Sequence, residues 1–385
     1  MAEWIECKIS DIGTVVGGAT PSTKKPENYE NGTIAWITPK DLSTFTGRYI
    51  QRGERNITEI GLKSCSTQLL SKDTVLFSSR APIGYVAIAA NELCTNQGFK
   101  SVVPNENTDP LFLYYLLKYN KDKIEGMGSG TTFKEVSGNT MKNIVVSVPT
   151  DKKVQEKISS MLGSIDDKIE ENERINNNLE QQAQAIFKSW FIDFEPFSNR
   201  KPSDWSVSTL GNVSLMGAGG DKPQNVSPIK TDLYEYPIYS NGLSNEGLYG
   251  FTDKPKISEE SVTVSARGTI GFVCLRHIPY VPIVRLVTLI PKTEIVSAKY
   301  LYLWLKQLHI TGTGTTQQQL TVPDFQKTEI LVPSQKIVTL FTATVEPIFE
   351  KIWANQNENE KLSSLRDTLL PKLMSGELDV SDIEI

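Results

Sequence analysis

The sequence predicts an α+β fold in which two similar mixed α/β domains alternate with two long helices that form an antiparallel coiled coil. Three observations support this prediction: the length of 385 residues, a set of motifs that occurs twice in the same order, and two polar segments with a heptad period. A chain of this length exceeds one ordinary hydrophobic core. We expect a domain at residues 1–150, a helix within 151–196, a second domain at 197–333, and a helix with a tail at 334–385.

The internal repeat is long and degenerate. WIECKISDIGTVVGG at Trp4 corresponds to WSVSTLGNVSLMGAGG at Trp205, and GSGTT at Gly128 corresponds to GTGTT at Gly312. Three further pairs keep the same order: LFSSRAPIGYVAI with TVSARGTIGFVCL, LFLYYLLK with KYLYLWLK, and IVVSVP with EILVP. Their offset falls along the chain, as expected when loops differ in length. The two halves are therefore predicted to share one scaffold.

Each half ends in a segment with the a/d spacing of a coiled coil. The expected seam positions are Ile158, Ile165, Asn172, Leu179 and Ile186 in the first segment, and Ile352, Asn359, Leu362 and Leu369 in the second. An asparagine buried in such a seam fixes the register of the helices. Pro347 predicts a kink or a later start of the second helix.

A single helix with an exposed apolar seam would be unstable, so we expect the two long helices to pack against each other. The order domain, helix, domain, helix makes that packing antiparallel. The alternative is that each helix packs only on its own domain.

The domains themselves read as mixed α/β. Short β-branched runs bounded by Gly, Pro and Asn, such as TVLFSSR, GYVAIAA and NIVVSVP, predict strands, and SVTVSAR, GFVCL and VRLVTLIP repeat them in the second half. PLFLYYLLKYNKDKIE predicts one helix that begins at Pro110, and SAKYLYLWLKQL predicts its counterpart.

The formal net charge of −5 argues at first against binding to nucleic acid. The acidic excess is local, however. Residues 151–196 carry 6 basic and 10 acidic side chains, and residues 334–385 carry 5 and 9. The remaining two blocks are slightly basic, so the bulk charge does not exclude DNA as a partner.

Other bulk properties indicate a cytoplasmic protein. The four cysteines form no CxxC pair and read as reduced thiols. The sequence has no run of 18 apolar residues and its N-terminus lacks the apolar region of a signal peptide, so we expect no membrane association.

The sequence offers no catalytic set and no metal site. In GSGTTFKEV the lysine comes too late for a Walker A loop, and GTGTTQQQL has no lysine. The glycines of MGAGGDKP lack dinucleotide-binding spacing. We find no Asn-Pro-Pro-aromatic loop of an amino-methyltransferase, no clustered carboxylates with E-x-K of a nuclease, and no GxSxG. The two histidines, His277 and His309, lack a neighbouring ligand candidate, and His309 reads as a helix-end or surface residue.

The order of these elements resembles the specificity (S) subunit of type I restriction-modification systems. The resemblance covers essentially the whole chain and is carried by SDIGTVVGGATPS, IAWITPKDL, LFSSRAPIGYVAI, TNQGFKSVVP, SIDDKIEENERINNNLEQQAQAIFKSWFIDFEP and LRDTLLPKLMSGELDV. The helix motifs are the specific ones. One departure is that YPIYSNGLSNEGLYG stands in the second half where a copy of WITPKDL would be expected.

The resemblance implies a non-catalytic subunit with two target-recognition domains, each of which reads one half of a bipartite site in double-stranded DNA. It implies two methyltransferase (M) subunits and restriction (R) subunits as partners, with S-adenosylmethionine and ATP with Mg²⁺ bound by those partners and no cofactor on this chain. The alternatives are a coiled-coil scaffold without DNA readout and a free-standing enzyme.

Sequence readout needs Arg, Lys, Asn or Gln at base edges and Ser, Thr or Lys on phosphates. The candidates in the repeated loops are Thr38, Lys40, Ser79, Arg80, Ser129, Thr131, Thr132 and Lys134 in the first domain, and Ser240, Asn241, Arg267, Thr315, Gln317 and Gln318 in the second. The structural alternative for Arg80 and Arg267 is a bridge between strand ends, and for the threonines it is a turn cap.

Overall fold

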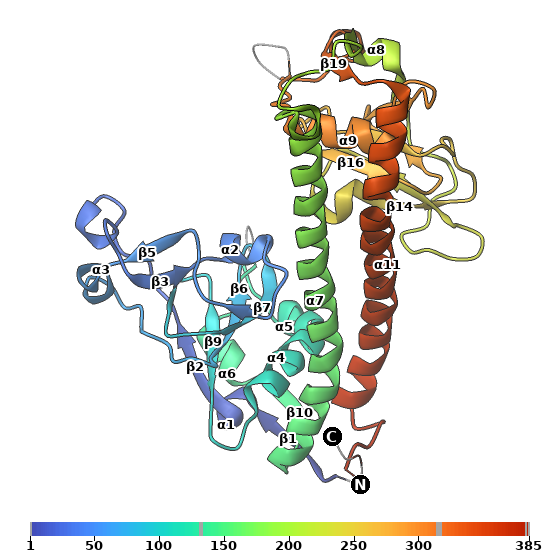
Figure 1. The fold of residues 1–385 in the computed structure, drawn as a ribbon. Coiled ribbons are helices and arrows are strands. Elements are labelled where there is room, and N and C mark those ends of the chain that lie inside the picture. Colours follow the sequence, from blue (N-terminus) through green and yellow to red (C-terminus); the bar gives the residue numbers. More distant parts are fainter. Residues whose placement is uncertain (1, 131–133, 313–317, 382, 384–385) are drawn as a thin grey trace. The chain divides into compact units, whose positions relative to one another are not determined.

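The computed structural model describes residues 2–130, 134–312, 318–381 and 383, and it contains two compact units (Figure 1). Unit 1 comprises Met1–Glu173 with Gln356–Ile385, and unit 2 comprises Arg174–Asn355. Each unit contains one globular domain and parts of both long helices. Unit 1 is thus built from two segments that are far apart in the sequence.

The described residues of the domain of unit 1 form three sheets. The five-stranded sheet has the order β2-β9-β6-β7-β4, the three-stranded sheet β5-β3-β8, and the last is the pair β1-β10. The strands are β1 (Trp4–Lys8), β2 (Gly13–Gly17), β3 (Ile34–Ile37), β4 (Tyr49–Ile50), β5 (Arg55–Ile57), β6 (Val75–Ser79), β7 (Ile83–Ala89), β8 (Cys94–Thr95), β9 (Lys100–Pro104) and β10 (Val145–Pro149).

Short helices connect these strands: α1 (Ile9–Ile12), η1 (Pro26–Asn28), α2 (Pro39–Ser43), α3 (Glu59–Lys63), α4 (Pro110–Tyr119), α5 (Lys121–Gly126) and α6 (Gly138–Lys142). α4 begins as predicted, with Pro110 in its first turn and the Asp109 carboxylate accepting from the Phe112 backbone at 2.7 Å. The single helix predicted from Pro110 is wrong, because it ends at Asn120 and α5 follows. The Asn120 amide donates to the Leu116 carbonyl at 2.9 Å, a local bond that competes with continued helix.

The described residues of unit 2 form three corresponding sheets, but the largest has four strands, because no strand corresponds to β4. The strand orders are β12-β18-β15-β16, β14-β13-β17 and β11-β19. The strands are β11 (Ser206–Thr209), β12 (Ser214–Ala218), β13 (Tyr236–Tyr239), β14 (Leu248–Thr252), β15 (Ser261–Val264), β16 (Val273–Arg276), β17 (Val281–Pro282), β18 (Val287–Pro291) and β19 (Glu329–Val332). The connecting helices are η2 (Glu195–Phe197), α8 (Leu210–Val213), η3 (Ser244–Gly247), α9 (Ala298–Gln307) and α10 (Val322–Phe325). β13 pairs parallel with β17, as β3 pairs parallel with β8, so the repeat extends to strand direction.

The long helices α7 (Lys152–Phe191) and α11 (Gln335–Met374) run antiparallel, as predicted, and each has 40 residues. In unit 1 the Asn172 amide donates to Asn359 Oδ1 at 2.8 Å, while Arg366 pairs with Asp166 at 2.8 Å. Along α7 from Asp166 to Asn172, the contacted residue of α11 moves back from Arg366 to Asn359, which happens only in an antiparallel pair.

The asparagines at the helix seam obey the repeat. Asn172 and Asn176 stand at the positions of Asn355 and Asn359 in the second half. In unit 2 the Asn355 amide donates to Asn176 Oδ1 at 2.8 Å, the counterpart of the Asn172–Asn359 bond in unit 1. The predicted positions Asn172 and Asn359 therefore form one amide pair, and Asn176 with Asn355 forms its equivalent. Such pairs are satisfied in one register only.

The apolar seam positions serve two neighbours rather than one. Ile158 and Ile352 are buried, whereas Ile165, Leu179, Ile186, Leu362 and Leu369 are half-buried. Leu179 and Ile186 pack on the core of unit 2, and Leu369 packs on the core of unit 1. The alternative in which the helices pack on their domains is therefore also realised, because each helix contacts both a domain and the other long helix.

α11 runs without interruption through Pro347, so the predicted later start is wrong. Pro347 itself is exposed, while Val345 and Phe349 on either side are buried in one cluster with Phe187 and Phe191 of α7. The Phe191 and Phe341 rings, for example, meet edge to face with centroids 4.8 Å apart. This aromatic packing holds the helix on both sides of the proline and offsets its missing backbone bond.

Candidate nucleic-acid interface

The first candidate residues lie at the start of α2 in unit 1. Thr38 is the N-cap of α2: its hydroxyl donates to Asp41 Oδ2 at 2.6 Å, and its backbone N–H donates to the same oxygen at 2.7 Å. Lys40 is exposed and forms an ion pair with Glu54 at 2.8 Å. The hydrogen bond to Glu54 raises the pKa of the Lys40 ammonium. Thr38 therefore shapes the turn, and Lys40 presents a charge that is partly balanced by Glu54.

Ser79 and Arg80 follow at the end of β6 and differ in exposure. Ser79 is fully buried, and its hydroxyl donates to the Gly98 carbonyl at 3.1 Å. In this conformation its side chain belongs to the fold. The Arg80 side chain is 35% exposed and pairs with Glu135 at 3.6 Å. Because a guanidinium carries five donors, this contact leaves others available to a ligand.

The glycine loop after α5 is fixed at both of its ends. The backbones of Ser129 and Glu135 exchange two hydrogen bonds, of 3.0 and 2.9 Å. The Val136 N–H donates to the Ser79 carbonyl at 3.0 Å. Ser129 and Lys134 are exposed on this loop, whereas Thr131 and Thr132 lie outside the described residues.

A turn at Asn96–Gly98 joins these pieces into one edge. The Asn96 N–H donates to the Ile37 carbonyl at 2.9 Å, which lies immediately before Thr38. The Ser79 N–H donates to the Gly98 carbonyl at 2.7 Å. A Cβ on Gly98 would lie only 2.7 Å from Pro39 Cγ, so glycine is needed for this close approach. The start of α2 and the end of β6 therefore border one turn, and Figure 1 shows these two elements near each other within unit 1.

The second domain assembles its candidates through Asn241. The Asn241 amide donates to the Val284 carbonyl at 2.7 Å, and its oxygen accepts from the Ala266 N–H at 2.7 Å. The Ser240 hydroxyl and backbone N–H both donate to the Gly247 carbonyl, at 3.4 and 2.8 Å. Asn241 thus holds the loop after β13 against the residue that precedes Arg267, while Ser240 closes the loop itself.

Arg267 is exposed and contacts the second glycine loop. Its Nη2 donates to Gln319 Oε1 at 2.9 Å, and the Leu320 N–H donates to the Ala266 carbonyl at 3.0 Å. Gln318 is exposed, whereas Thr315 and Gln317 lie outside the described residues. We call two sets of contacts the strand–loop clasps. The first is the Arg80–Glu135 pair with the Val136–Ser79 backbone bond, and the second is the Arg267–Gln319 bond with the Leu320–Ala266 backbone bond.

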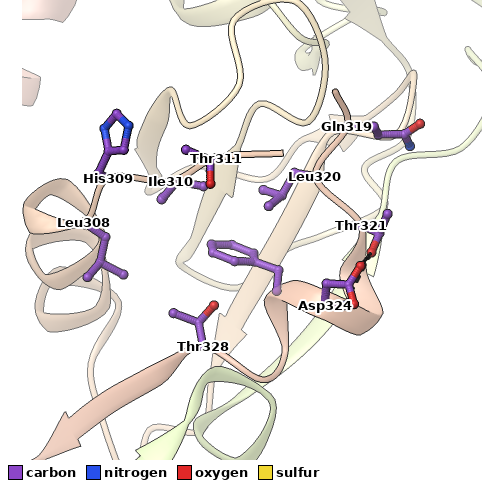
Figure 2. Close-up of a pocket in the computed structure, with 10 residues that line it drawn as sticks. Leu308, His309, Ile310, Thr311, Gln319, Leu320, Thr321, Asp324 and Thr328 are labelled. Atoms are coloured by element: carbon purple, nitrogen blue, oxygen red, sulfur yellow. Dashed lines mark hydrogen bonds between the residues drawn. The ribbon is translucent and has the colours of Figure 1, made fainter. Parts of the chain in front are cut away.

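A cavity of about 250 Å³ lies beside the second clasp (Figure 2). It is lined by Leu308, His309, Ile310, Thr311, Gln319, Leu320, Thr321, Asp324, Phe325 and Thr328. Figure 2 shows Asp324 turned toward Thr321, whose hydroxyl donates to its carboxylate at 2.7 Å and whose residue caps α10. The acid of this cavity is therefore occupied by a helix cap.

From the sequence we interpreted Phe133–Glu135 and Gln317–Gln319 as the divergent ends of the glycine loops, but did not identify the partners of the two arginines. Glu135 and Gln319 each receive the arginine, and Lys100 on β9 pairs with Glu135 at 3.3 Å. The signal was present, since Glu135 follows Gly128 by the same spacing as Gln319 follows Gly312. Their role differs from that of a base reader, because these side chains face the arginines.

Two further properties of the described residues bear on function. They contain no group of three or more His, Cys, Asp or Glu side chains that could hold a metal ion. No helix among them is long and apolar enough to cross a membrane.

Comparison with known proteins decides the family. The model described as "Type I restriction modification DNA specificity domain" matches residues 1–181 and 202–363. The chain belongs to the type I restriction-modification DNA specificity family. The two matched stretches include the two domains described above, as expected for a specificity chain with an internal repeat.

Relatives of this specificity chain match it along most of their length. The type I restriction enzyme MjaIX specificity subunit of Methanocaldococcus jannaschii is 36% identical, over 99% of this chain and 95% of its own. The HindI specificity subunit of Haemophilus influenzae is 25% identical, over 98% of this chain and 100% of its own. The crystal structure of the S subunit from M. genitalium matches with a TM-score of 0.59 at 18% identity, covering 97% of this chain and 96% of that one, and so shares the fold.

Proposed function

We propose that this chain is the DNA sequence-recognition subunit of a type I restriction-modification complex. Each globular domain reads one half of a bipartite site, and the paired helices set the gap between the halves. This conclusion rests on one observation: the two domains share three sheets and an equivalent strand–loop clasp but differ in the loops beside the clasp. A shared scaffold with different loops suits two readers of different sequences.

The loops differ most after the first parallel strand. β3 leads into α2 with Thr38 and Lys40, whereas β13 leads into η3 and the next strand with Ser240 and Asn241. The end of the glycine loop differs as well, with Lys134 in the first domain and Gln318 in the second. These exposed or half-buried positions are our candidates for contact with DNA, together with Ser129 and the two arginines.

The partners follow from the family. Methyltransferase subunits, two for the two halves of the repeat, dock on the helices, and restriction subunits join through them. The chain itself is non-catalytic and binds no cofactor, so S-adenosylmethionine and ATP with Mg²⁺ belong to the partner subunits. The complex acts in the cytoplasm, where its DNA lies.

Coexpression with the neighbouring methyltransferase gene, followed by mapping of methylated adenines, tests the proposal. We expect a bipartite sequence with a gap of fixed length. A contiguous motif, or methylation without sequence preference, would refute it.

Exchange of a domain tests the modular part. Replacing residues 1–150 by the corresponding domain of a relative should change one half of the methylated sequence and leave the other half and the gap unchanged. Replacing residues 197–333 should change only the other half. A change in both halves after either exchange would contradict independent reading.

The alternatives give different results in the same experiments. A coiled-coil scaffold without DNA readout would support assembly but give no sequence preference. A free-standing enzyme would show activity as the purified chain without partner subunits.

A further inference from the structure

The two strand–loop clasps are equivalent in position and differ in chemistry. Arg80 and Arg267 occupy the same place in the motifs SSRAPIG and SARGTIG, and Glu135 and Gln319 the same place in the glycine loops. The glycines that follow the arginines, Gly84 and Gly271, both have positive φ, of 99° and 85°. Both arginines are thus held by the same backbone frame.

The charges around the clasps balance in a specific way. Lys100 pairs with Glu135, and its Nζ lies 3.5 Å from Ser79 Oγ. Lys100 pairs with Gly17 at the end of β2, and Val287 pairs with Ala218 at the end of β12. Val287 therefore takes the place of Lys100 in the second domain. The acid Glu135 and the base Lys100 are therefore replaced together, by Gln319 and Val287. Each clasp keeps one net positive charge.

This constancy separates the arginines from the loops around them. The loops differ between the domains, as residues that read different bases must. The arginines keep their identity, backbone frame and net charge. Contacts that are the same in two readers of different sequence suit the phosphate backbone, which is the same at every step.

We propose that Arg80 and Arg267 are phosphate anchors, one in each domain, and that they do not read bases. Glu135 occupies one side of the Arg80 guanidinium and Gln319 one side of that of Arg267, which leaves the remaining donors for a phosphate oxygen. Glu135 also neutralises the added charge of Lys100 and so keeps the first anchor equal to the second. This assignment rests on the proposed function and deepens it.

Salt dependence of binding provides the test. The assembled complex with its methyltransferase subunits is titrated with a DNA duplex that carries the mapped site, and with a duplex of scrambled sequence, over a series of KCl concentrations. Each phosphate that the protein neutralises contributes about 0.9 to the slope of log K against log salt. Arg80→Gln and Arg267→Gln should each reduce the steepness of this negative slope by about 0.9 on both duplexes and leave the methylated sequence unchanged.

Glu135→Gln gives the opposite expectation, because it frees Lys100 and Arg80 from their shared acid. The negative slope of log K against log salt should become steeper by up to about 0.9. Arg80→Lys keeps the charge and should keep the slope. This pair of variants also tests the proposal if Arg80→Gln fails to fold.

Matched controls remove one lysine in each domain that is not part of a clasp. Lys8 bonds Asn143 at 3.0 Å and Lys292 bonds the Asn212 carbonyl at 2.8 Å. Lys8→Gln and Lys292→Gln change the net charge equally and should leave the slope unchanged.

Two results would overturn the assignment. Relaxed preference at one half of the methylated sequence in an arginine variant would make that arginine a base reader. Slopes equal to wild type in Arg80→Gln and Arg267→Gln would make both arginines purely structural. If the wild-type complex shows no sequence preference, the proposed function fails, while the slopes on scrambled DNA still decide whether the clasps bind phosphate.

Discussion

Replacing Asn172 by Asp should destabilise unit 1 by a measurable amount although the two side chains have nearly the same shape. The Asn172 side chain is buried, and its amide donates to Asn359 Oδ1 at 2.8 Å and to Glu358 Oε2 at 2.9 Å. Asp at this position would donate neither bond and would bring a second carboxylate next to Glu358.

The magnitude follows from the two lost bonds. A neutral hydrogen bond contributes about 1 kcal/mol and one to a charged group about 1.5–3 kcal/mol. The loss is therefore about 3 kcal/mol, to which the repulsion between the two carboxylates adds. With a urea dependence of about 2–3 kcal/mol per molar for a unit of this size, the first unfolding midpoint should fall by about 1 M or more.

Urea unfolding followed by circular dichroism checks this expectation. The first transition is compared, since a chain with two units does not unfold in a single step. Asn178→Asp is the control, because Asn178 is exposed on the same helix and the charge change is identical. Equal midpoints for the two variants would mean that the amide pair does not hold the helices, and the account of the seam would be wrong.

Three other expectations concern the thiols, a buried arginine and the helix length. Burial raises the pKa of the Cys94 and Cys274 thiols to about 11 and about 12, so little thiolate exists at pH 8. Iodoacetamide should therefore label half-buried Cys65 in the native protein, and Cys94 and Cys274 only in urea, as read by peptide mass spectrometry. Labelling of Cys274 in the native protein would contradict its burial. The Arg48 side chain is 5% exposed and bonds Glu170 at 3.0 Å and also Asp167. Arg48→Met should therefore cost about 3 kcal/mol of stability and lower the first thermal midpoint by about 6–10 °C. A drop of less than about 2 °C would place these two ion pairs among ordinary surface contacts. Deleting seven residues from α7 and seven from the facing part of α11, while keeping the asparagine pairs, should shorten the recognised gap by about three base pairs. The reason is that one heptad spans about 10.5 Å and a base pair about 3.4 Å. An unchanged gap in the methylated sequence would refute the role of the helices as the spacer.

The sequence predicted the elements whose signal is periodic or repeated. The heptad pattern led to α7 and α11 and to the buried Asn172, since only a helix places such positions on one face. The repeat led to two domains with one scaffold. The break at Asn120 was not predicted, because one asparagine that bonds its own helix is a weak signal inside an apolar run.

The candidate interface was predicted less completely. Arg80 and Arg267 were chosen as candidates because they are repeated, and both lie where loops converge. Ser79 was chosen as a candidate for DNA contact because it precedes Arg80, yet it is fully buried. Alternation along a short strand does not show whether one or both faces of its sheet are covered. The ion pair of Glu135 with Lys100 was not predicted, because it depends on how β9 lies beside the glycine loop, which no local pattern encodes.

The composition of unit 1 has a consequence for how the protein is made. Leu373, Met374 and Val380 are buried in the same core as Phe112 and Ile158, which precede them by more than 200 residues. Unit 2 is continuous from Arg174 to Asn355, so the ribosome releases all of its residues before the first domain receives its closing helix. At about 5–20 residues per second, the first domain waits on the order of 10–40 s with apolar surface uncovered. The domain synthesised first is therefore the last to be completed, and until then its uncovered apolar surface favours aggregation.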